Sequence, residues 1–131
     1  MILVVNASVM VAALVDGGPD GHWAGAVLVD HELAAPHLIP IEATSILHRA
    51  ALAGDITADA ASLAHDGLLD LRVELWPYAP LADRSWELRG NVTVCDGTEV
   101  ASAELLDAPL AKLDQRLAAA PGPRCRFLAA T

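Results

Sequence analysis

Residues 91–114 have the sequence NVTVCDGTEVASAELLDAPLAKLD, and the other elements of the chain can be arranged around this stretch. Apolar residues recur at helical spacing between Asp96 and Leu106, which predicts a helix with one packed face. The short apolar run 109–113 predicts a buried strand. If this strand belongs to a parallel sheet, Asp114 lies at its carboxyl edge, where open α/β sheets bind their ligands. We therefore expect the two carboxylates to reach one crevice.

Both carboxylates also have a purely structural interpretation. Residues 96–99, DGTE, suit a capping box in which the first side chain accepts a backbone N–H and Glu99 reaches back to the start of the helix. Asp114 could likewise cap a turn formed by residues 115–120. The local sequence leaves these alternatives open.

The composition is that of one globular domain spanning residues 1–131, a length that allows one substantial core. Hydrophobic residues make up 54% of the chain and aromatic residues only 4%, so the core must be built mainly from Val, Leu, Ile and Ala. This apolar content is too high for a disordered chain.

The formal net charge of −9 argues against broad electrostatic attachment to nucleic acid or to an anionic membrane. It does not exclude a nuclease, because an acidic metal centre is a local feature, and it favours a basic protein partner. No apolar run reaches the roughly 18 residues needed to span a bilayer, and Met1 is not followed by a signal-peptide pattern. Cys95 and Cys125 lack metal-ligand spacing. We expect a cytoplasmic protein without membrane contact.

The start of the chain brings a polar side chain to the same sheet edge. Residues 2–5 form a continuous apolar run, typical of a central strand that is covered on both faces. The run stops at Asn6, and residues 9–15 predict a helix. This order places Asn6 at the carboxyl edge, although Asn6 and Ser8 are also suitable helix caps.

A further acidic position lies on a helix predicted to begin at Pro40, because proline is well tolerated in the first turn. Ile39, Glu42 and Ile46 fall on one stripe of this helix, so Glu42 interrupts an otherwise apolar face. Burying a charge among aliphatic side chains costs more than the helix dipole returns, unless a cation is nearby. Glu42 is therefore a candidate functional residue.

The remaining segments complete an α/β pattern. Further strands are predicted at residues 33–36, 71–76 and 124–128, and further helices at residues 22–30, 57–68 and 81–89. The order βααβααβαβ(α)β is that of a three-layer α/β domain with a mostly parallel sheet.

Three segments together resemble a PIN-domain ribonuclease, and more narrowly a VapC-type toxin of a type II toxin–antitoxin system. They are MILVVNASVMVAAL, HLIPIEATSILHRA and NVTVCDGTEVASAELLDAPLAKLDQRL. The likeness covers essentially the whole chain. The four acidic positions of the family correspond here to Asn6, Glu42, Asp96 and Asp114, and Ser8 matches a small hydroxyl residue near the first.

The resemblance implies an α/β/α fold and a Mg²⁺-dependent endoribonuclease, with Mn²⁺ as an alternative metal. Crowded carboxylates repel one another unless cations neutralise them, and Mg²⁺ prefers oxygen ligands. Bound metal ions orient a water for attack on a phosphodiester. Glu99 is a candidate extra ligand, with a capping role as its alternative. The implied partners are cellular RNA and a VapB-like antitoxin that binds a homodimer near Trp23 and residues 57–68.

The main departure from the family pattern is Asn6, which stands where the first Asp is expected. Its amide keeps a carbonyl oxygen but loses a full negative charge. One charge pair at about 4 Å is worth about 4 kcal/mol at an effective dielectric near 20, before solvation offsets. We therefore expect weak metal binding and low activity, which Asn6→Asp should raise. The alternative is a catalytically inert PIN-like module that binds an antitoxin or RNA without cleavage.

Overall fold

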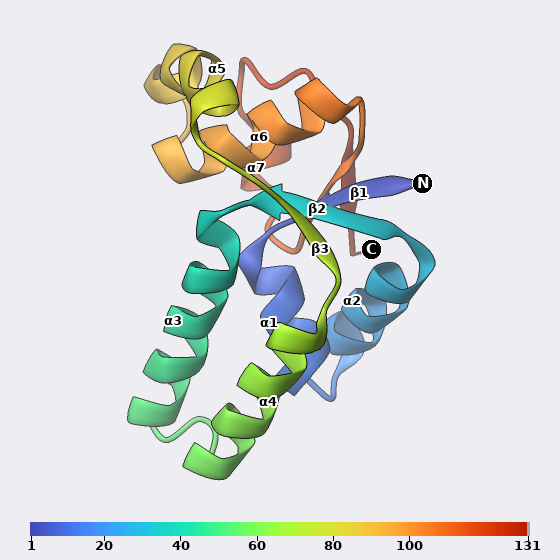
Figure 1. Cartoon of the computed structure of the whole chain (residues 1–131), viewed down its shortest axis with the longest axis vertical. Coiled ribbons are helices and arrows are strands. Elements are labelled where there is room, and N and C mark those ends of the chain that lie inside the picture. Colours follow the sequence, from blue (N-terminus) through green and yellow to red (C-terminus); the bar gives the residue numbers. More distant parts are fainter. Residues whose placement is uncertain (131) are drawn as a thin grey trace.

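Five parallel strands form one central sheet, which the computed structural model describes together with its helices over residues 1–130 (Figure 1). The spatial order is β3-β2-β1-β4-β5, and every neighbouring pair is parallel. The strands are β1 (Ile2–Val5), β2 (Glu32–Pro36), β3 (Val73–Trp76), β4 (Leu110–Lys112) and β5 (Phe127–Ala129).

Helices cover both faces of this sheet, as Figure 1 shows. One layer contains α1 (Ala7–Val15), α2 (Pro19–Asp30), α3 (Leu38–Leu52) and α4 (Ala58–Asp70). The other contains α5 (Ala82–Glu87), α6 (Val94–Leu106) and α7 (Arg116–Ala119), with short 3-10 turns at Ala79–Leu81 and Leu88–Gly90 on either side of α5. The predicted three-layer α/β/α architecture is confirmed.

The central strand β1 divides the core into two parts. Leu3 and Val5 are fully buried on the side of α1 to α4, whereas Val4 is buried on the side of α6. Val4 shares its cluster with Leu110 of β4 and Val100 of α6. This alternation explains the continuous apolar run at the start of the chain, because a strand covered on both faces needs apolar side chains at every position. Each such residue stabilises the fold by about 1.5–3 kcal/mol.

The strand order changes direction between β1 and β4, and we call the carboxyl edge of the sheet at this point the crevice. The chain passes from β1 outwards to β2 and β3, and then returns to place β4 on the other side of β1. Loops therefore diverge from the carboxyl ends of β1 and β4, which is where open parallel sheets bind ligands. Val5 pairs with Ala111, so Asn6 follows β1 at the level where Lys112 ends β4. The amino-terminal turns of α3 and α6 reach the same edge.

Several predicted boundaries shift by a few residues. The helix predicted to begin at Pro40 begins at Leu38, which places proline in the first turn, where a missing N–H leaves no helical hydrogen bond unmade. The helix predicted from residue 9 begins at Ala7. The strand predicted at 71–76 begins only at Val73, because α4 continues to Asp70. The last strand is Phe127–Ala129 rather than 124–128.

None of the helices within residues 1–130 combines the length and the apolar character needed to cross a membrane.

Candidate functional site

Asn6 lies at the junction of β1 and α1, with only 7% of its surface exposed. It is the N-cap of α1, because its side-chain Oδ1 accepts the backbone N–H of Val9 at 3.1 Å. The Ser8 hydroxyl donates to the same oxygen at 2.9 Å. The capping interpretation of Asn6 is therefore confirmed, and Ser8 supports it. The one oxygen that Asn6 could offer to a cation already accepts two hydrogen bonds.

Glu42 lies at the border of the buried face of α3 rather than within it. The buried positions of this helix are Ile39, Ala43 and Leu47, spaced four residues apart, whereas Glu42 is only partly buried. The predicted stripe through Glu42 was wrong by about one position, because that helical face turns towards the sheet edge. The Glu42 carboxylate faces the thiol of Cys95 on α6. Burial, together with this carboxylate, raises the pKa of Cys95.

Asp96 lies in the first turn of α6, and its side chain is not the cap of this helix. Thr93 is the N-cap, and its hydroxyl accepts the backbone N–H of Asp96 at 3.1 Å. The predicted capping box with Asp96 as the cap was therefore wrong, because the N-cap lies three residues earlier, at Thr93, and the helix begins at Val94. The Asp96 carboxylate instead accepts a charge-assisted hydrogen bond from Nζ of Lys112, at 2.7 Å.

Glu99 follows one turn later on α6 and is buried, with 3% of its surface exposed. Its Oε2 lies 3.6 Å from Nζ of Lys112 and has no hydrogen-bond partner within residues 1–130. The predicted capping role was wrong, since Glu99 lies six residues after the N-cap Thr93, and a capping box requires a separation of three. Burial raises the pKa of Glu99 to about 8, the Lys112 ammonium only partly offsets this, and the neighbouring Asp96 carboxylate adds to it.

Asp114 follows β4 but is exposed and engaged with its own loop. It accepts the backbone N–H of Arg116 at 2.9 Å and the Nε–H of the same residue at 2.8 Å. Side-chain and backbone hydrogen bonds from Arg116 lower the pKa of Asp114 to about 2. The predicted capping of the turn after β4 is confirmed, since Arg116 is the first residue of α7.

Lys112 is the functional residue that the sequence reasoning missed. It ends β4, and its side chain is only 12% exposed although it carries a charge. It is also the single lysine of the chain, placed at the end of an otherwise apolar strand. That isolated charge beside Asp114 was a usable signal, because lysine is rarely buried unless it is paired.

As arranged, these side chains do not fit a divalent metal ion. Within residues 1–130, no group of three or more His, Cys, Asp and Glu side chains is placed to hold one ion. Asn6 is neutral, and its side-chain oxygen caps α1. Oδ1 of Asp96 already accepts a hydrogen bond from Lys112. Asp114 is paired with Arg116. A crevice that should attract a cation is therefore already partly neutralised.

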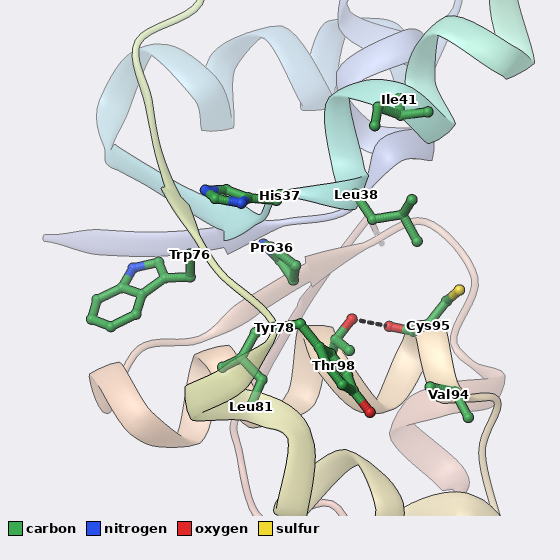
Figure 2. Close-up of a pocket in the computed structure, with 10 residues that line it drawn as sticks. All are labelled: Pro36, His37, Leu38, Ile41, Trp76, Tyr78, Leu81, Val94, Cys95 and Thr98. Atoms are coloured by element: carbon green, nitrogen blue, oxygen red, sulfur yellow. Dashed lines mark hydrogen bonds between the residues drawn. The ribbon is translucent and has the colours of Figure 1, made fainter.

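An apolar pocket of about 420 Å³ opens beside the crevice, between the amino-terminal turns of α3 and α6 (Figure 2). Figure 2 shows Leu38 and Ile41 of α3 on one side and Val94, Cys95 and Thr98 of α6 on the other. Leu38, Ile41 and Val94 are exposed to solvent. The pocket adjoins Glu42, since a smaller hollow lined by Glu42 shares Leu38 and Ile41 with it.

Fold and site together define a PIN-type α/β/α protein with an acidic crevice at the carboxyl edge of a parallel sheet. No family model matches the sequence. The chain is 40% identical over 125 residues to Ribonuclease VapC1 of Mycobacterium tuberculosis, covering 95% of this chain and 94% of the relative. It is 32% identical over 124 residues to Ribonuclease VapC9 of the same species, with the same coverage. The chain therefore belongs to the VapC ribonuclease family.

Solved structures support the fold. VapC20 of Mycobacterium tuberculosis, described as a sarcin-ricin loop cleaving toxin, matches with a TM-score of 0.69 at 17% identity, covering 89% of this chain and 93% of that one. VapBC2 of Rickettsia felis, bound to a promoter DNA fragment, matches with a TM-score of 0.70 at 14% identity over 100% of both chains.

Proposed function

We propose that this chain is the toxin of a VapBC-type toxin–antitoxin pair and that its crevice is an endoribonuclease centre with weakened activity. The observation that carries the proposal is the 40% identity to Ribonuclease VapC1 across 95% of the chain. Three acidic positions of the family pattern, Glu42, Asp96 and Asp114, are present in this chain. The substrate class is RNA, because RNA cleavage is the activity for which these relatives are named.

Weak activity follows from the charges in the crevice. Glu42 and Asp96 are the carboxylates that would face a phosphodiester and accept a proton from an attacking water. Asp96 is bound to Lys112, and Asn6 contributes no charge. Magnesium dependence stays a prediction, with Mn²⁺ as the alternative, and we propose that this chain binds either metal weakly.

We also propose that the partner is a VapB-like antitoxin which combines apolar side chains with a basic one. The apolar pocket next to Glu42 would take the first kind, and the acidic crevice the second. A second hollow of about 540 Å³ lies between the end of α1 and α4, in the region where the sequence predicts a partner groove. Trp23, named in the same prediction, is partly buried and packs against the core. A homodimer stays a prediction.

Cleavage of structured RNA tests the catalytic part of the proposal. The chain alone should cleave slowly, and Asn6→Asp should raise the Mg²⁺-dependent rate. The matched control is Asn6→Asp combined with Glu42→Gln, which keeps the restored charge but removes a crevice carboxylate and should lose the gain. If Asn6→Asp cleaves no faster than the unchanged protein, even though it binds Mg²⁺, the nuclease proposal fails.

A specific observation favours one other candidate, the inert module that binds an antitoxin or RNA without cleavage. Lys112 places a positive charge where a catalytic centre of this type would concentrate negative charge. Co-purification of the antitoxin with an RNA-inactive Asn6→Asp protein would support this second candidate.

A further inference from the structure

We propose that Lys112 is a built-in counter-cation, so that its ammonium group neutralises the crevice between Asp96 and Glu99 in the place of a divalent metal ion. This inference uses the proposed function only to locate the crevice, and its tests do not require RNA cleavage.

The geometry that carries the proposal is a single ammonium group facing two carboxylates. Nζ of Lys112 lies 2.7 Å from Oδ1 of Asp96 and 3.6 Å from Oε2 of Glu99. The two acids are three residues apart on α6, so both side chains leave the helix on nearly the same side. Lys112 reaches them from the neighbouring strand β4, and its side chain is mostly buried. The contact therefore joins the helix to the sheet edge.

A second observation shows that the crevice is built to receive a cation. Glu99 is buried, and its Oε2 has no hydrogen-bond donor within residues 1–130. A buried carboxylate oxygen without a donor is costly, so such groups normally face a cation or a proton. Among the residues that the structure describes, the cation paired with it is the ammonium of Lys112, at a distance slightly too long for a hydrogen bond. The Lys112 ammonium therefore compensates this oxygen by charge rather than by a hydrogen bond.

Lysine and a divalent ion compete for the same oxygens. Mg²⁺ binds oxygen at about 2.0–2.1 Å and needs several such ligands. An ammonium group hydrogen-bonded to Asp96 occupies that oxygen and repels a second cation. The ammonium of Lys112 also lowers the formal negative charge of the crevice by one. Asn6 removes the further charge that the family pattern would supply. Tight metal binding would therefore require both Asp at position 6 and removal of the Lys112 charge.

Lys112 can be observed directly because the chain contains no other lysine. Protein produced with isotope-labelled lysine has one side-chain signal in a nuclear magnetic resonance spectrum. We expect a protected ammonium signal that millimolar Mg²⁺ does not shift, compared with a NaCl control of equal ionic strength. A signal shifted or released by Mg²⁺ would show that the metal displaces Lys112 in the unchanged protein, and would overturn the proposal.

Substitution provides the second test. Lys112→Gln should lower the melting temperature without divalent metal and should create a stabilising response to Mg²⁺ or Mn²⁺. Combined with Asn6→Asp, it should bind the metal about tenfold or more tightly than Asn6→Asp alone. The matched control is Arg84→Gln, which breaks the ion pair between Arg84 of α5 and Glu104 of α6. This variant should gain no response to metal. Equal metal affinity with and without Lys112 would overturn the proposal.

Two outcomes separate this inference from the proposed function. If the double variant binds metal but cleaves no RNA, the counter-cation is supported and the nuclease proposal fails. If Lys112→Gln does not fold, the spectrum of the unchanged protein still decides the question.

Discussion

Two of the three acidic side chains on helix α6, Glu99 and Glu104, meet their basic partners in opposite ways. Near its carboxyl end, Glu104 receives Nε of Arg84 on Oε1 at 2.8 Å, and the backbone N–H of Arg124 on Oε2 at 2.8 Å. Near its amino end, Glu99 has only Lys112 at 3.6 Å, and one of its oxygens lacks a hydrogen bond within residues 1–130. The two carboxylates lie on the same helix and face a similar type of partner, but only Glu104 accepts hydrogen bonds on both of its oxygens.

The pKa values follow this difference. Burial alone would raise the pKa of Glu104, but the hydrogen bonds from Arg84 and Arg124 outweigh it and lower the pKa. Burial dominates at Glu99 and raises its pKa to about 8. The Glu104 cluster therefore joins α5, α6 and the segment before β5 as a structural support. At the sheet edge, by contrast, the Lys112 ammonium only partly compensates the carboxyl groups of Asp96 and Glu99, as expected of a functional site.

The largest loss of stability is expected from Arg84→Gln. It leaves Glu104 with a single backbone donor, and we expect the free energy of unfolding to fall by about 2 kcal/mol, because a partly buried carboxylate loses its cation. Urea denaturation measures this loss. Stability from a carboxylate with a lowered pKa is present above its ordinary pKa and disappears as the pH falls, so the loss should shrink in acid.

The matched control for this pair is Glu87→Gln. Glu87 also contacts Arg84, at 3.2 Å, but is mostly exposed. If Glu87→Gln lowered the free energy of unfolding as much as Arg84→Gln does, the stabilising contact of Arg84 would be the one with Glu87 and not the one with Glu104.

A smaller, pH-dependent effect is expected from Glu99→Gln. The pKa of Glu99 rises from 4.5 to about 8 on folding, so between these values the native state binds the extra proton. The stability of the unchanged protein should therefore decrease as the pH rises through this window. Relative to it, Glu99→Gln should become progressively more stable between pH 5 and pH 8. Parallel stability curves for the two proteins would contradict the burial of an unsatisfied carboxylate.

A loss of about 1 kcal/mol is expected from Thr93→Ala, which removes the hydroxyl that caps α6 next to the crevice. Thr57→Ala removes an equivalent cap from α4, far from the crevice, and should cost about the same. Thermal unfolding compares the two. If Thr93→Ala also altered the Lys112 signal while Thr57→Ala did not, the start of α6 would be shown to position Asp96.

The smallest effect is expected from Arg116→Gln, because Arg116 and Asp114 are exposed. The melting temperature should not change measurably, since exposed ion pairs contribute little. The pKa of Asp114 should rise from about 2 towards its ordinary value, which a pH titration by nuclear magnetic resonance would detect. An unchanged pKa would mean that Arg116 does not hold this carboxylate in solution.

The fold was predictable because its signals are local and redundant. The apolar run at residues 2–5 and the alternation of strand and helix predicted a parallel sheet, and the sheet edge followed from that order. The contents of the crevice were less predictable. Whether Asp96 caps α6 depends on a shift of a few residues in the helix start, and Thr93 takes that role. The approach of Lys112 to Asp96 depends on the pairing of β4 with β1, which no local pattern reveals.

Calorimetric titration of Mg²⁺ tests most directly whether Lys112 stands in for the metal. The unchanged protein should release no measurable heat of binding, whereas the double variant Asn6→Asp, Lys112→Gln should bind the metal at one saturable site. Binding by the unchanged protein with the affinity of the double variant would contradict a resident counter-cation at this crevice.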